Sequence, residues 1–212
     1  DKLYGGSGAD KVYGQAGNDS LYLDAGNDTL DGGSGTDWLY VTGSTNSVVN
    51  LAKTTGQNTG YGTDIIKNIE NASGGTGVDK FYGTTGNNTL KGNNGNDLLY
   101  GQNGNDTLYG GNNNDRLYGG NGNDTLKGDA GNDLLQGDAG KDTMFGGAGA
   151  DTFVFRSTTH SSASASGADI IGDFTRGVDK IDLHFIDAST KLSGNNAFTF
   201  DGTTSFGTSN QG

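Results

Sequence analysis

The amino-acid sequence predicts an all-β protein: a right-handed parallel β-roll, which is a β-helix solenoid, with a β-rich C-terminal cap. Three observations predict it. Nonapeptides follow one another in a fixed frame over more than half of the 212 residues, as is typical of a solenoid. The chain has 41 glycines, which suit closely spaced turns. Of the 25 acidic residues 24 are aspartate, and this shortage of glutamate disfavours helices.

The composition excludes several classes of protein. The formal net charge is −12, and the chain has no cysteine, so we expect neither a disulfide framework nor a thiolate metal site. The excess of acid disfavours nucleic acid as a partner, because phosphate binding needs an excess of Lys and Arg. We expect no transmembrane segment, since no apolar run approaches the roughly 18 residues that a membrane helix needs. Low hydrophobicity with high charge is typical of disorder, but disordered chains lack a strict period.

Thirteen nonapeptides lie in frame, four within residues 5–40 and nine within residues 74–154. Position 1 is Gly in 12 units, position 4 is Gly in 12, position 6 is Asp in 12, and position 8 is always a large apolar residue. Glycine adopts positive φ cheaply, and asparagine, as at Asn113, is the next best residue. We expect each unit to form a six-residue turn and a three-residue strand, with position 8 inward and positions 7 and 9 outward. Two units would make one coil around a thin core.

The repeat divides the chain into four parts. These are a first β-roll block over residues 1–40, a β-rich insertion over 41–73, a second block over 74–155 and a C-terminal capping segment over 156–212. The insertion is expected to form one or two wider coils. For its acids Asp64 and Glu70 the sequence favours a structural or solvated role over metal binding. Because the chain begins in mid-repeat, we expect it to be part of a longer protein.

The aspartates at position 6 indicate a metal. Stacked coils would place their carboxylates in columns at a spacing of about 4.8 Å, where bare charges repel one another. The chain has only 13 Lys and Arg residues, few of them in the turns. Ca²⁺ fits because it takes roughly six to eight oxygen ligands, and glycine turns expose carbonyls. Mg²⁺ keeps its waters and fits less well, and Zn²⁺ would want His or Cys.

The repeat GGxGxDxUx resembles the signature of RTX (repeats-in-toxin) proteins. The resemblance implies Ca²⁺ between successive turns on the same side, held by position-6 Asp and turn carbonyls. It also implies a secreted bacterial protein, exported by the type I secretion machinery. Asn88 at position 6 and Leu23 at position 1 depart from the pattern, so sites there should be weaker or lost. The predicted carboxylate ligands are Asp10, Asp19, Asp28, Asp37, Asp79, Asp97, Asp106, Asp115, Asp124, Asp133, Asp142 and Asp151. The predicted carbonyl ligands are Gly92, Gly95, Gly101, Gly104, Gly110, Gly119, Gly122, Gly128, Gly131, Gly137 and Gly140.

The C-terminal segment has a different pattern. Residues 168–174 and 177–183 are similar to the DxIxDFxxGxDKIDL segment of serralysin-type C-terminal domains, which implies a cap on the open end of the roll. Asp169, Asp173 and Asp179 are candidate ligands for further Ca²⁺. A solvated strand edge explains them equally well.

Tyrosines at position 9 suggest another partner. Tyr82, Tyr100 and Tyr118 should stack on one sheet face, and Tyr109 should lie on the other face between two lysines. Cross-strand packing explains such a column. An aromatic strip that binds polysaccharide is the functional alternative.

The function predicted from the sequence is that of a calcium-binding module of an exported bacterial protein, which folds on Ca²⁺ binding after type I secretion and serves folding, secretion and stability. One alternative is a carbohydrate-binding or adhesin module. Another is an accessory domain of a secreted protease, lipase or polysaccharide-modifying enzyme. We expect no enzyme activity in this segment, because it contains neither HExxH nor GxSxG.

Overall fold

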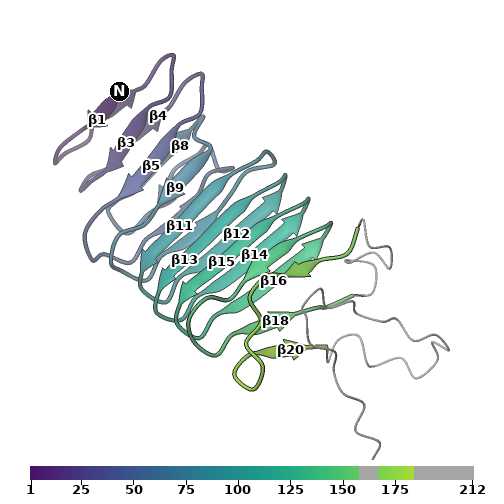
Figure 1. Cartoon of the computed structure of the whole chain (residues 1–212). Coiled ribbons are helices and arrows are strands. Elements are labelled where there is room, and N and C mark those ends of the chain that lie inside the picture. The colour runs from purple at the N-terminus through teal and green to yellow at the C-terminus, as the bar shows by residue number, and fades with distance from the viewer. Residues whose placement is uncertain (158–166, 184–212) are drawn as a thin grey trace, which may run out of the picture.

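The computed structural model describes residues 1–157 and 167–183, and these form short strands stacked as a β-solenoid (Figure 1). The strands are parallel except for one antiparallel pair in the insertion. The described part of the chain contains no helix, and therefore no membrane-spanning helix. The prediction of an all-β solenoid of stacked parallel coils is confirmed. Residues 158–166 and 184–212 of the predicted C-terminal segment lie outside the described residues.

Two walls enclose the core of the solenoid. One wall is a nine-stranded sheet, which contains in spatial order β1 (Lys2–Tyr4), β3 (Ser20–Leu23), β5 (Trp38–Val41), β9 (Asn71–Ser73), β11 (Thr89–Asn94), β13 (Thr107–Asn112), β15 (Thr125–Ala130), β17 (Thr143–Phe145) and β19 (Ile170–Ile171). The other wall comprises two sheets. The four-stranded sheet contains in spatial order β2 (Lys11–Tyr13), β4 (Thr29–Asp31), β8 (Thr63–Lys67) and β7 (Gln57–Asn58). The seven-stranded sheet contains in spatial order β20 (Lys180–Asp182), β18 (Thr152–Val154), β16 (Leu134–Ala139), β14 (Arg116–Asn121), β12 (Leu98–Asn103), β10 (Lys80–Tyr82) and β6 (Val48–Asn50).

The core consists of the position-8 side chains. In the nine-stranded sheet Leu90 pairs with Leu108, and Leu108 pairs with Leu126. In the seven-stranded sheet Leu99 pairs with Leu117. All of these side chains are fully buried, whereas most residues at positions 7 and 9 of the same strands are only half-buried. The predicted inward and outward alternation is therefore confirmed, and the hydrophobic effect stabilises the stack through this single column of side chains on each wall.

The central strands are longer than the sequence predicts. β11 to β16 have six residues each, and they continue into positions 1 to 3 of the next unit. The neighbouring coil is the reason, since Asn93 and Asn94 pair with Gly111 and Asn112 across it. Asn93 has a φ of 74°, which bends the strand at position 2 without ending the pairing. The division into a six-residue turn and a three-residue strand is therefore wrong for β11 to β16, because stacking extends these strands into the glycine-rich positions. It holds for β10, β17 and β18 of the same block, which have three residues each.

The insertion continues the solenoid on one wall and divides the other. β9 pairs with both β5 and β11, so the nine-stranded sheet passes through without a break. On the opposite wall β8 pairs with β4 and β6 pairs with β10, but the two sheets are not joined to each other. Leu23, which replaces glycine at the start of its unit, pairs with Val41, the first residue of the insertion. Both side chains are buried, so this departure from the repeat adds to the core.

The described part of the C-terminal segment extends both walls by one strand. β19 pairs with β17, and β20 pairs with β18. Phe174 lies on the core against Phe153, with a distance of 6.2 Å between the ring centroids. Residues 167–183 therefore cover apolar side chains of the last coils, as a cap requires.

The tyrosine columns lie where the repeat register places them. Tyr82 stacks on Tyr100 and Tyr100 on Tyr118, with ring centroids 4.9 and 4.8 Å apart. On the other wall Tyr109 lies between the ammonium groups of Lys91 and Lys127, which are 5.4 and 5.2 Å from its ring centroid. Both predicted arrangements are confirmed.

Candidate metal centre

Position-6 carboxylates of successive coils are joined into ladders by hydrogen bonds to the main chain. We name each ladder after the sheet whose strands its residues precede. The ladder of the seven-stranded sheet, the seven-strand ladder, contains Asp79, Asp97, Asp115, Asp133 and Asp151. In it the backbone N–H of Asp97 donates to Oδ1 of Asp115 at 2.7 Å, and the N–H of Asp115 donates to Oδ1 of Asp133 at 2.8 Å. Each carboxylate thus holds the coil before it, 18 residues earlier in the chain. A side-chain oxygen that accepts at this position therefore supports the stacking itself, before any metal is considered.

The other ladders have the same construction. The nine-strand ladder contains Asp19, Asp37, Asn88, Asp106, Asp124 and Asp142, and the four-strand ladder contains Asp10 and Asp28. The insertion contributes a member to each of these two ladders. The N–H of Asp28 donates to Asp64 Oδ1 at 2.8 Å, and the N–H of Asp37 donates to Glu70 Oε2 at 2.8 Å.

Asp64 and Glu70 therefore have structural roles as continuations of the ladders. Asp64 is fully buried and accepts a second hydrogen bond from the Thr59 hydroxyl, so a solvated role is wrong for it. A sequence signal for both existed. Each acid lies two residues before a buried apolar residue, Ile66 or Ala72, at the spacing of positions 6 and 8.

The second carboxylate oxygen of most ladder aspartates is buried without a hydrogen bond from any described residue. This holds for Oδ2 of Asp10, Asp19, Asp37, Asp97, Asp106, Asp115, Asp124, Asp133 and Asp151. A buried anionic oxygen with no donor is costly, because it has lost water and gained no partner. A cation bound between the coils would remove this cost. The arrangement therefore fits Ca²⁺, which accepts carboxylate and carbonyl oxygens in irregular geometry.

Carbonyl oxygens lie beside these orphaned oxygens at position 1 of the repeat. A Cβ built on Gly110 would be 2.4 Å from Oδ2 of Asp115 and 2.7 Å from the carbonyl oxygen of Gly128. Carboxylate and carbonyl oxygens of adjacent coils therefore converge on the bare face of Gly110. The same convergence involves the predicted carbonyls of Gly92, Gly110, Gly119, Gly128 and Gly137, whereas the carbonyl of Gly101 meets the amide oxygen of Asn88.

The predicted position-4 glycines form a separate column. The carbonyl of Gly104 faces Gly122, and the carbonyl of Gly122 faces Gly140, with Gly95 and Gly131 placed likewise in the alternate units. Their neighbours include position-5 asparagines such as Asn105, whose amide oxygen accepts from the N–H of Asn123 at 2.8 Å. That these carbonyls bind Ca²⁺ stays a prediction, as it does for every residue of the ladders.

Burial raises the pKa of the ladder carboxyl groups. The pKa of Asp115 rises to about 8 and that of Asp97 and Asp124 to about 7. For Asp106 and Asp133 the pKa rises to about 6. Burial is the main cause, hydrogen bonds from the main chain oppose it, and the charges of neighbouring ladder aspartates add to the rise for all but Asp106.

These shifts predict the pH dependence of the metal-free chain. Between about pH 4 and pH 8 the folded chain binds more protons than the unfolded chain, whose aspartates ionise near 3.8. The free energy of unfolding should therefore fall as pH rises through this window. We expect far-ultraviolet circular dichroism of chain freed of metal on a chelating resin to give a stronger β signal at pH 5 than at pH 8. A β signal that rises with pH would contradict the assignment.

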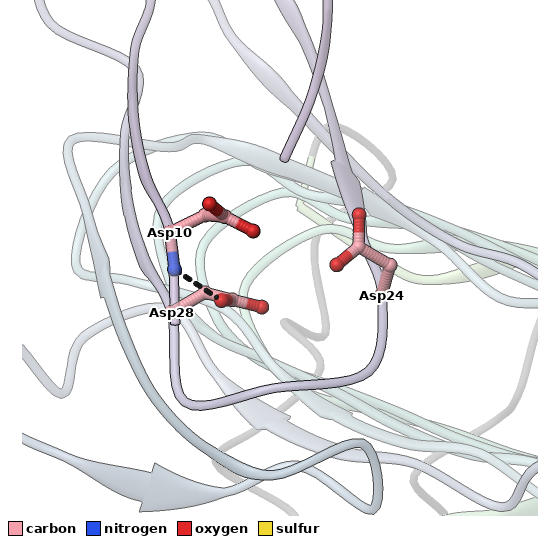
Figure 2. Close-up of side chains that lie close together, drawn as sticks. All are labelled: Asp10, Asp24 and Asp28. Carbon is pink, nitrogen blue, oxygen red and sulfur yellow. Dashed lines mark hydrogen bonds between the residues drawn. The ribbon is translucent and has the colours of Figure 1, made fainter. Parts of the chain in front are cut away.

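Three carboxylates converge in the first block (Figure 2). Asp10, Asp24 and Asp28 each bring an oxygen to within 4.8 Å of the others. Asp24 Oδ2 accepts from the N–H of Gly6 at 2.8 Å, while Oδ1 of Asp24 and Oδ2 of Asp10 are buried and accept no hydrogen bond from the described residues. Sequence reasoning missed Asp24, which follows Leu23 at position 2. The weaker site predicted at Leu23 stays a prediction, but this coil supplies a third carboxylate where the repeat has lost its glycine.

Replacing Asp24 with asparagine tests this cluster. The amide can still accept from Gly6, so the fold should tolerate the change, but one negative charge beside the metal position is lost. Ca²⁺ should protect the backbone amides of residues 6–31 from hydrogen exchange. We expect the Ca²⁺ concentration that gives half of this protection to be about tenfold higher in the variant than in the unmodified chain. Asp129→Asn is the matched control, because Asp129 occupies position 2 of another unit and is exposed. Equal effects of the two substitutions would contradict a role for Asp24 in the cluster.

The C-terminal aspartates also bind main-chain amides of the last coils. The N–H of Asp142 donates to Asp169 Oδ1 at 2.9 Å, and the N–H of Asp151 donates to Asp179 Oδ1 at 3.1 Å, which extends two ladders. Asp173 accepts from the N–H groups of Gly146 and Gly147, both at 2.9 Å. All three therefore fasten residues 167–183 to the roll. Their binding of Ca²⁺ stays a prediction.

The RTX calcium-binding nonapeptide repeat family matches residues 1–40, 73–108, 92–126 and 118–153, more than half of the chain. The chain belongs to this family. No curated protein matches the sequence. Calcium is therefore the cation that these repeats bind, as their oxygen-rich composition predicts. The likeness of residues 168–183 to serralysin-type proteins stays a prediction.

Proposed function

We propose that this RTX chain is a calcium-triggered folding module of an exported bacterial protein. It crosses the cell envelope unfolded through a type I secretion machinery and folds outside, where it stabilises the protein that carries it. The support is the set of buried carboxylate oxygens that have no donor among the described residues. At low Ca²⁺ these charges oppose folding, and at high Ca²⁺ the ions stabilise it.

The concentration range of the transition follows from the chemistry of the ligands. Extracellular calcium modules bind with dissociation constants of about 10⁻⁴ to 10⁻³ M, far above the range of cytosolic sensors. Each ladder shares its carboxylates between adjacent coils, so binding of one ion orders the ligands of the next. The transition should therefore be cooperative in Ca²⁺.

Titration of the chelator-treated chain with Ca²⁺, followed by far-ultraviolet circular dichroism, tests this proposal. We expect little β signal below about 1 μM free Ca²⁺ and a cooperative gain at about 0.1 to 1 mM. Mg²⁺ at the same concentrations is the control and should give a much smaller gain, because it keeps its waters. A full β spectrum in excess chelator at pH 7.5 would contradict the proposal.

We further propose that the chain has no catalytic activity of its own. The support is its sequence, which contains no HExxH or GxSxG motif. Any activity of the exported protein would then belong to another part of it, whether protease, lipase or polysaccharide-modifying enzyme. Assay of the folded chain against casein, tributyrin and polysaccharides should give no turnover. Turnover of any of these substrates would contradict this proposal.

A further inference from the structure

The stacked tyrosines restrict where a ligand can pack. Tyr100 lies between Tyr82 and Tyr118, with interplanar angles of 5° and 11°, so both of its faces are covered by neighbouring rings. The ammonium group of Lys80 lies 5.1 Å from the ring centroid of Tyr82. Since sugars stack on ring faces, the column does not offer the extended aromatic strip that its sequence suggests. The end of the column at Tyr118 is different.

At Tyr118 the aromatic column ends and a groove begins. The next residue in register is Gln136, which has no ring to stack on Tyr118. The groove has a volume of about 360 Å³, which is within the range of small-ligand sites. It is lined by Tyr100, Gln102, Tyr118, Gly119, Gly120, Gln136, Asp138 and Arg156.

Gln136 is the unusual residue of this groove. It occupies position 9, which is half-buried in most units, yet only 4% of it is exposed. Its Nε2 donates to Asp138 Oδ1 at 2.6 Å, which fixes the orientation of the amide. Its Oε1 is then buried and accepts no hydrogen bond from the residues that the structure describes. Because Gln136 lines the groove, the donor that this acceptor lacks among the described residues can come from a molecule bound there.

We propose that this groove binds an uncharged sugar residue of a glycan. A sugar hydroxyl is both a donor and an acceptor, so it can donate to Gln136 Oε1 and accept from the guanidinium of Arg156. Tyr118 provides an aromatic wall for the apolar face of the ring. The carboxylate of Asp138 and the net charge of −12 disfavour an acidic ligand.

A titration of the ¹⁵N-labelled, Ca²⁺-saturated 212-residue chain tests the proposal. The probes are maltohexaose, cellohexaose, laminarihexaose, mannohexaose and galactohexaose, with hexagalacturonate as the acidic comparison. We expect at least one neutral probe to shift the side-chain amide signals of Gln136 in a saturable way. The dissociation constant of hexagalacturonate should be at least tenfold higher than that of this neutral probe. If no neutral probe shifts these signals, or if the acidic probe binds as tightly as the best neutral one, the proposal is overturned.

Three variants locate the site. Gln136→Leu removes the acceptor with nearly the same shape, and Tyr118→Ala removes the aromatic wall; each should weaken sugar binding at least tenfold. Tyr109→Ala is the matched control, because Tyr109 occupies the same repeat position on the opposite wall. It should leave sugar binding within twofold of the unmodified chain. Circular dichroism of each sample separates loss of sugar binding from loss of fold, and equal weakening by all three changes would overturn the proposal.

Discussion

Replacement of Gly110 with alanine should destabilise the Ca²⁺-loaded fold by about 3 kcal/mol or more, as expected for severe overpacking against atoms that cannot move away. The added Cβ would meet Oδ2 of Asp115 at 2.4 Å and the carbonyl oxygen of Gly128 at 2.7 Å. One of these atoms belongs to the main chain of the next coil, and the other is the predicted calcium ligand of its own unit. The substitution therefore separates two coils and displaces a ligand with a single methyl group.

Gly86→Ala is the matched control for this prediction. A Cβ at Gly86 would approach only the Thr84 hydroxyl oxygen, at 3.8 Å, which is an ordinary contact. The control should change the free energy of unfolding by less than about 1 kcal/mol, and the loss of backbone freedom in the unfolded chain favours the alanine. Urea denaturation in 5 mM Ca²⁺ would measure both variants. Similar stabilities for the two alanines would show that position-1 glycines are not needed for close approach of the coils.

The regular features of the fold follow from the repeat. A nine-residue period, with two units to a coil, brings residues 18 apart into register, so Leu99 pairs with Leu117 and Tyr100 with Tyr118. Position 8 is buried because strand residues alternate between two faces, and Asn113 takes a positive φ of 78° at position 4, as the position-4 glycines of the neighbouring units do. Inward position, ladder membership and aromatic stacking are all properties of the period. They could therefore be predicted from the sequence alone.

The remaining features depend on departures from the repeat. The carboxylate of Asp24 lies close to those of Asp10 and Asp28, and the side chain of the preceding Leu23 is buried in the core. The nine-residue period does not relate position 2, where Asp24 lies, to position 6, where Asp10 and Asp28 lie. Gln136 is fixed by Asp138 two residues later, and both lie in a groove with Arg156 from beyond the last repeat. The six-residue strands depend on pairing between coils and not on local preference. Such contacts become visible only when the coils are placed against one another.

The ladder aspartates and the single ladder asparagine lead to opposite predictions. Asp115→Asn keeps an oxygen that accepts from the N–H of Asp97. It removes a buried carboxyl group whose pKa is raised to about 8 and which is therefore largely charged at pH 8.5. Without Ca²⁺ at pH 8.5 the variant should be more stable than the unmodified chain, by roughly 1 to 3 kcal/mol, because no charge is buried there. With Ca²⁺ it should be less stable, because an amide is a weaker ligand than a carboxylate.

Asn88→Asp should have the reverse effect. The Nδ2 group of Asn88 donates to the carbonyl of Glu70 at 2.6 Å, and a carboxylate placed there would bring oxygen against oxygen. The metal-free chain should therefore lose stability at pH 8.5. Ca²⁺ should restore it and add to it, since a cation can bind the new carboxylate and the Glu70 carbonyl together. Urea midpoints measure the two variants in 5 mM Ca²⁺. In chelator, titration with trimethylamine N-oxide, which favours the folded state, measures the stability of the two metal-free variants. If both substitutions changed stability in the same direction under both conditions, the position-6 side chains would not be calcium ligands, and the buried charge of the ladders would need another counterion.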